Sequence, residues 1–111
     1  FDFHSICSAD HINFGEAKYS SSSTTYGVAL DQAGGFLDTK KHKRDWVHLR
    51  NLCSPASIQK LNDNLHGVVA AFSVHAKNPL TVYKNALQRA VEFAQEKGVS
   101  FVYMVGITHE D

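Results

Sequence analysis

The sequence has few cysteines, no excess of charge of either sign and no long apolar run. Its two cysteines, Cys7 and Cys53, cannot form the disulfide framework of a small secreted domain, so free thiols are expected. Lysine plus arginine and aspartate plus glutamate each total 11, which disfavours tight, non-specific attraction to a polyanion. The longest apolar stretch, near residues 68–74, is far shorter than the ~20 residues that span a bilayer. No N-terminal signal peptide is visible, and we therefore predict a cytoplasmic protein without a membrane partner.

The composition is typical of a folded globular domain. Hydrophobic residues make up 43% and charged residues 20% of the 111-residue chain, which argues against disorder. A chain of this length can bury one modest core but not two, so residues 1–111 are predicted to form a single domain.

The first half of the chain predicts a β-hairpin followed by a helix. Residues 1–7 and 11–19 are rich in aromatic and β-branched types, and a short polar stretch separates them, as in a hairpin. The segment from Thr25 to about Asn51 has apolar residues at helical spacing. Gly34 and Gly35 weaken the middle of this helix, where they indicate either a break or the close approach of another element.

The second half predicts a short helix and a strand-helix-strand unit. Ser54 and Pro55 are typical of a helix start, and this helix is expected to end near residue 64. A buried strand over 67–76, a helix over 79–97 and an apolar strand over 99–108 follow, which indicates a parallel βαβ unit. The predicted fold class is thus an α/β sandwich, with a mixed central sheet, an N-terminal β-hairpin, flanking helices and a C-terminal βαβ unit.

Three charged side chains of the predicted hairpin are expected to lie together. Every second side chain of a strand shares a face, so Glu16 and Lys18 point the same way. A turn centred on Ala9 pairs residues whose numbers sum to 18, which places Asp2 opposite Glu16. A slip of one residue in this register would separate the three groups.

Two carboxylates and an ammonium group in this arrangement are suited to phosphodiester hydrolysis. Carboxylates about one strand spacing apart can hold Mg²⁺, or Mn²⁺ in its place, through hard oxygen ligands. The metal acidifies a bound water and neutralises charge that develops on the phosphate, while the lysine orients or deprotonates the water. The other interpretation is an exposed hairpin face that carries an ordinary salt bridge.

The opening segment resembles the signature of the PD-(D/E)xK nuclease superfamily, which has a restriction-endonuclease-like fold. The residues that carry the resemblance are Phe-Asp-Phe at 1–3 and Ile-Asn-Phe-Gly-Glu-Ala-Lys-Tyr at 12–19. The resemblance implies that Asp2, Glu16 and the backbone carbonyl of Ala17 bind the metal. It also implies that Lys18 serves the attacking water.

The resemblance extends to Gln32, and the sequence differs from the family pattern at two points. Gln32 and Phe36 form a Gln-x-x-x-Phe pattern that is similar to the family's helical Gln-x-x-x-Tyr, which implies a catalytic role for Gln32. Phe1 stands where the family motif has proline. The family core also opens with a helix and a strand before the aspartate, and nothing precedes Phe1 here, so either these elements are missing or a partner chain supplies them.

We therefore predict a Mg²⁺-dependent nuclease that hydrolyses DNA, in restriction, defence, repair or recombination. The basic run Lys40, Lys41, Lys43 and Arg44 is the candidate contact to DNA phosphates, although a solvated helix face explains it equally well. Cutting both strands with so small a domain usually requires two copies, so a homodimer is one expected state. A non-catalytic nucleic-acid-binding or assembly module on the same fold is the alternative function, and a small α/β domain unrelated to nucleic acid is a third.

Overall fold

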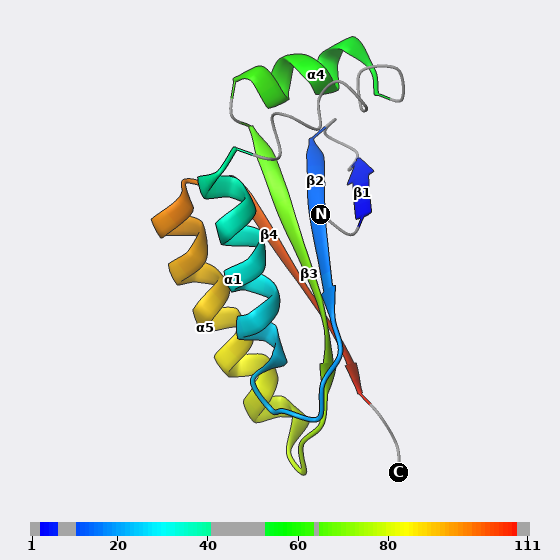
Figure 1. Ribbon diagram of the computed structural model, residues 1–111, viewed down its shortest axis with the longest axis vertical. Helices are drawn as coiled ribbons and strands as arrows, with labels where there is room; N and C mark the ends of the chain where they lie inside the picture. Colours follow the sequence, from blue (N-terminus) through cyan, green and yellow to red (C-terminus); the bar gives the residue numbers. More distant parts are fainter. Residues whose placement is uncertain (1–2, 7–10, 41–52, 64, 109–111) are drawn as a thin grey trace.

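The computed structural model describes residues 3–6, 11–40, 53–63 and 65–108, with the side chains of 4–6 and 62 left out. Four strands form one sheet in the order β1-β2-β3-β4, and the bounds are Phe3–Ile6, Ile12–Lys18, His66–Val74 and Phe101–Thr108 (Figure 1). β1 runs antiparallel to β2, whereas β2, β3 and β4 run parallel to one another. The mixed sheet and the general α/β class are as the sequence predicted.

The hairpin register agrees with the predicted one. Phe3 pairs with Gly15 and Ile6 pairs with Ile12, so every described pair has residue numbers that sum to 18. On its other side β2 pairs with β3, where Glu16 lies opposite Ala70 and Lys18 lies opposite Phe72. Glu16 and Lys18 thus lie past the last described pair with β1, and β3 is their described neighbouring strand.

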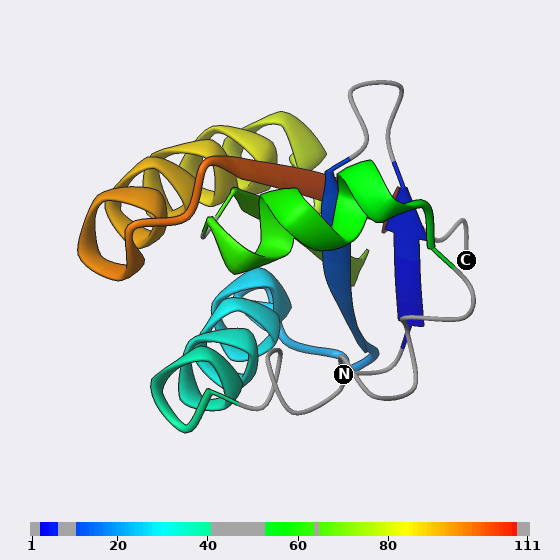
Figure 2. The ribbon, with the colours of Figure 1, turned by 90° about the horizontal axis from the view of Figure 1, so that it is seen from above.

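Three helices are described: α1 (Thr25–Asp38), α4 (Pro55–Asn62) and α5 (Pro79–Lys97). α1 and α5 lie side by side over one face of the sheet, and α4 lies across the end of the sheet near the start of β2 (Figures 1 and 2). The predicted helix from Thr25 to about Asn51 is too long, because α1 ends at Asp38 and Lys40 has a positive φ of 58°. Residues 41–52 lie outside the described residues. None of the described helices is both long and apolar enough to serve as a membrane span.

Local signals place the helix ends. Ser54 accepts a hydrogen bond from the Ser57 N–H, and Pro55 occupies the first turn, as expected at the start of α4. α5 ends at Gly98, whose φ of 65° is the left-handed conformation that glycine adopts without a side-chain clash. The βαβ unit predicted from these signals is present as β3-α5-β4, with its two strands parallel.

Gly34 marks a close approach of α5 rather than a break in α1. The helix continues through residues 34 and 35. A Cβ added at Gly34 would lie 3.1 Å from Lys97 Cε and 3.2 Å from Phe93 Cε2, so the missing side chain lets the two helices pack closely.

The core lies between the helices and one face of the sheet. Its largest cluster joins α1 and α5 to β3, and its members are Ala29, Leu30, Ala33, Leu37, Val68, Ala70, Phe93 and Val99. A second cluster places Leu61 of α4 against Ile12 and Phe14 of β2. The even-numbered side chains of β2 and β3 thus face the helices.

The opposite face of the sheet differs from the predicted sandwich. Phe101, Tyr103, Val105 and Ile107 of β4 alternate along the strand and are 39–55% exposed on that face. All three described helices contact the sheet from the other side (Figure 2). The described residues therefore form two layers, and the β4 side of the second sheet face is left open, whereas Asn13, Gly15 and Gly67 on that face are buried.

Candidate functional site

Glu16 is completely buried near the middle of the sheet. Its exposed fraction is 0%, and its side chain lies on the helix-covered face together with Phe14. On that face the neighbouring positions are Ala70 of β3 and, one strand further, Met104 of β4. Burial of a carboxylate is costly unless a cation, a proton or hydrogen-bond donors compensate.

Lys18 lies two residues further along β2, at the end of the strand. It shares the face of Glu16, as predicted, and it is only partly buried. The loop that follows is fixed to β3, because the Ser20 N–H donates to Ser73 Oγ at 2.9 Å and Ser73 Oγ donates back to the Ser20 carbonyl at 3.0 Å. These two hydrogen bonds fix the end of β2 at the point where the chain turns towards α1.

Ala17 lies between these two residues and points its side chain to the open face, where it is exposed. The predicted metal contact of Ala17 is made by its backbone carbonyl, so the orientation of the side chain does not test this contact. A metal contact through Ala17 stays a prediction.

Asp2 lies outside the described residues. The described part of the hairpin reaches Phe3 opposite Gly15, which is one step short of the predicted pair of Asp2 and Glu16. No group of three or more histidine, cysteine, aspartate or glutamate side chains suited to a metal occurs among residues 3–6, 11–40, 53–63 and 65–108. That observation does not bear on a metal pair that includes Asp2.

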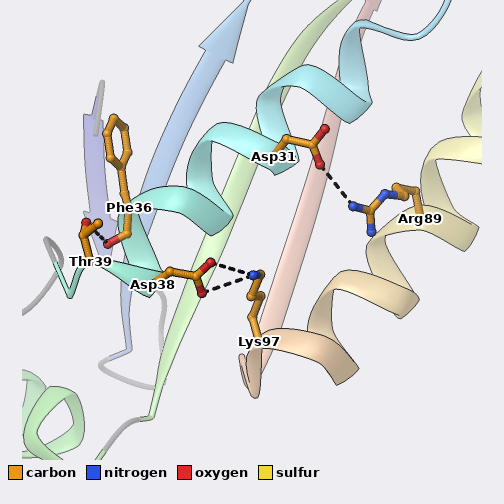
Figure 3. A network of polar contacts seen from close by, with 6 residues as sticks. All are labelled: Asp31, Phe36, Asp38, Thr39, Arg89 and Lys97. Atoms are coloured by element: carbon orange, nitrogen blue, oxygen red, sulfur yellow. Dashed lines mark hydrogen bonds and ion pairs between the residues drawn. The ribbon is translucent and has the colours of Figure 1, made fainter.

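Gln32 is half-buried on α1, the helix that packs over β2 and β3. Phe36, one turn later, points away from α5 and towards the β1 side of the sheet (Figure 3). Residues four apart share a helix face, so Gln32 lies on the same flank. This places Gln32 on the side of α1 nearer to β2, and its contact with substrate or metal stays a prediction.

Only one member of the predicted basic run is described. Lys40 is exposed just past the end of α1, with φ of 58°, and its N–H donates to the Leu37 carbonyl. Lys41, Lys43 and Arg44 lie outside the described residues. Their proposed contact with phosphate is therefore not placed relative to Glu16.

A polar cluster between α1 and α5 was not predicted from the sequence. Asp31 pairs with Arg89 at 3.1 Å and Asp38 pairs with Lys97 at 2.9 Å, beside a cavity of about 210 Å³ (Figure 3). The two aspartates are seven residues apart, and their partners Arg89 and Lys97 are eight residues apart on the facing helix, which is about two helical turns in each case. The spacing could have indicated charged flanks, but not which helices face each other.

Cys53 is a half-buried free thiol beside the cluster of α4 and β2. Burial raises the pKa of this thiol above its ordinary value. The raised pKa lowers the thiolate fraction at neutral pH, so Cys53 is poorly suited to act as a nucleophile.

Comparison with protein-family models, with curated proteins and with solved structures finds no match to this chain.

Proposed function

We propose that this chain is a Mg²⁺-dependent nuclease domain that hydrolyses phosphodiester bonds in DNA, related to the PD-(D/E)xK superfamily. The observation that carries the proposal is the hairpin register, since all described pairs of β1 and β2 follow the pairing that the site requires. The proposal requires the register to continue by one residue, so that Asp2 meets Glu16. A shift of the β1–β2 pairing by one residue would have separated these side chains and removed the basis of the proposal.

The burial of Glu16 adds a second, physical argument. A carboxylate with 0% exposure is compatible with a neighbouring cation, and Mg²⁺ is a hard cation that carboxylates bind well. Asp2 and Glu16, with the carbonyl of Ala17, would hold the metal. When bound, the metal would supply charge neutralisation and an acidified water.

The positions of Lys18 and Gln32 are consistent with roles beside such a metal. Lys18 follows Glu16 on the same face and is partly exposed, so its ammonium group can reach a phosphate and a water that enter from solvent. Gln32 is half-buried one helical turn before Phe36 and on the same flank of α1, where its amide would orient a ligand or the phosphate. Lys40, with Lys41, Lys43 and Arg44, would contact the DNA backbone by charge, which predicts binding that weakens as salt rises.

A cleavage assay tests the proposal. We expect the purified chain with Mg²⁺ or Mn²⁺ to cut plasmid DNA, and we expect Lys18→Ala to lower the rate about 10²–10⁴-fold because the water loses its proton acceptor or orienting group. Lys84→Ala is the matched control, because Lys84 is exposed on α5, away from β2. A labelled RNA of the same sequence separates DNA from RNA specificity.

Two different results would contradict the proposed nuclease function. Cleavage that survives in Lys18→Ala at the rate of Lys84→Ala would exclude the proposed role of Lys18. DNA binding without any metal-dependent cleavage, in a chain whose circular dichroism shows the native fold, would instead support the non-catalytic binding module.

A further inference from the structure

The open sheet face, defined by the side chains opposite to α1 and α5, carries no charge in its described part. Strand alternation assigns eleven positions of β2, β3 and β4 to it. These are Asn13, Gly15, Ala17, Gly67, Val69, Ala71, Ser73, Phe101, Tyr103, Val105 and Ile107. The exposed residues among them are largely apolar or aromatic, which is the composition of an interface centre rather than of a solvated surface.

The shape of the open sheet face is a ridge beside a trough. Tyr103, Val105 and Ile107 of β4 stand up as the ridge, 42–55% exposed. The next two strands carry small residues, with Ala17 opposite Ala71 in the same row as Val105. A hollow of about 260 Å³ lies over these small residues.

The chemistry of the hollow disfavours a nucleic acid or a small ligand as its occupant. Lys18 is the single lysine among the residues that line the hollow, and the eleven positions of the open sheet face include no lysine or arginine to meet a phosphate. The hollow is smaller than the roughly 300–1,000 Å³ of typical ligand pockets, and it is lined chiefly by apolar atoms. Its size fits one or two aliphatic side chains from another protein surface.

We propose that the open sheet face is the contact surface of a homodimer, in which two copies of this chain pack face to face about a two-fold axis. In such an isologous contact each copy meets the same surface of the other, so the ridge of β4 enters the partner's trough in both directions. Two sheets packed in this way lie about 10 Å apart, with their side chains interdigitated. Because its eleven strand positions are uncharged, the contact buries no charge from them, and Lys18 lies at the rim of the hollow.

The exposed area is sufficient for a reversible dimer. Tyr19, next to the hollow, is 74% exposed, and four β4 side chains are 39–55% exposed. With aromatic side chains of about 150–250 Å² each, the exposed apolar area is on the order of 500 Å² per copy. This area is below the roughly 800 Å² per partner of a standard interface and falls among weak, reversible contacts, so we expect a dissociation constant in the micromolar range.

The dimer is independent of the proposed catalysis. Glu16 and Gln32 belong to the helix-covered side of the sheet, whereas the contact uses the other side. Lys18 follows Glu16 on β2 and also lines the hollow, so two copies joined through the open sheet faces would hold Lys18 at the rim of the contact and Glu16 away from it. Failure of the nuclease assay would leave this proposal standing, and the reverse also holds.

Sedimentation equilibrium with a matched pair of variants tests the dimer. We expect the wild-type chain to change from monomer to dimer as its concentration rises through the micromolar range, and Val105→Glu to weaken dimerisation at least about tenfold because it buries an unpaired charge. Val91→Glu is the control, because Val91 is 57% exposed on the outer side of α5, compared with 46% for Val105. A monomer at every concentration overturns the proposal, and so does a dimer that Val91→Glu breaks and Val105→Glu leaves intact.

Methyl NMR of the unmutated chain gives a second measurement that does not depend on a variant folding. We expect the methyl signals of Val69, Val105 and Ile107 to shift between dilute and concentrated samples. Those of Leu87 and Val91, which are comparably exposed on α5, should stay constant. Signal shifts that occur only for the α5 residues would contradict the proposed surface, and so would the absence of shifts in both sets.

Discussion

At the scale of single residues, the space around each Cα decides which side chains the fold accepts. A Cβ at Gly67 would overlap Asn13 Oδ1 and lie 3.2 Å from the Phe101 carbonyl oxygen, which is backbone and cannot rotate away. A Cβ at Gly35, on the exposed side of α1, would meet nothing within 4 Å. The sequence alone shows two glycines with no sign that one is required and the other is not, because the neighbours of Gly67 come from other strands.

Two alanine substitutions test this contrast. We expect Gly67→Ala to lower the free energy of unfolding by about 1–3 kcal/mol through overpacking between β2, β3 and β4. We expect Gly35→Ala to raise it by about 0.5–1 kcal/mol, since alanine loses less backbone entropy than glycine inside a helix. Urea unfolding followed by circular dichroism measures both. Equal effects of the two substitutions would show that the described packing at Gly67 is wrong.

At the scale of elements, the sequence predicted what local signals determine. The helix over 79–97 has the predicted bounds, because Pro79 is compatible with its first turn and Gly98 ends it. The hairpin register was predictable because its short turn leaves few pairings that keep Ile12 and Phe14 in the core. The strand predicted from Val99 begins at Phe101 instead, and Val99 packs into the core cluster before the strand starts.

The pairing of α1 with α5 could not be predicted from local signals. It depends on a close approach at Gly34 and on the ion pairs Asp31–Arg89 and Asp38–Lys97, whose partners are 58 and 59 residues apart. The aspartates are 71% and 62% exposed, so each pair is worth no more than about 1 kcal/mol and contributes orientation rather than stability.

The left-handed end of α5 gives an element-scale test. We expect Gly98→Ala to destabilise the chain by about 1–2 kcal/mol, because an L-residue at φ of 65° brings its Cβ near the following carbonyl. Gly98→Asn should cost less, since asparagine tolerates this conformation better than alanine does. Thermal unfolding measures the difference, and a Gly98→Asn variant less stable than Gly98→Ala would contradict the assignment of the helix end.

At the scale of the whole molecule, the general α/β class and the mixed sheet were predictable, whereas the one-sided cover of the sheet was not. β4 carries apolar residues at nearly every position, so its sequence fits burial on both faces. The alternation of exposure along Phe101–Thr108 arises only because the described helices all lie on one side. A strand with apolar side chains on an open face needs a partner surface, which is the basis of the proposed dimer.

The candidate site shows the same division between local and distant information. Glu16 and Lys18 share a face because strand geometry requires it, and this followed from their spacing alone. The complete burial of Glu16 did not follow, because it depends on the cover that α1 places over β2. The central functional claim joins these two features to Asp2 in one divalent-metal site.

A Mn²⁺ titration by isothermal calorimetry tests that claim most directly, because it reports the metal site without requiring a DNA substrate. We expect one Mn²⁺ site in the wild-type chain, its loss in Asp2→Asn and in Glu16→Gln, and its retention in Glu92→Gln, where an exposed glutamate of α5 is neutralised in the same way. Circular dichroism of each variant confirms that the fold is kept. No Mn²⁺ binding by the wild-type chain, or binding that Asp2→Asn and Glu16→Gln leave unchanged, would contradict the account.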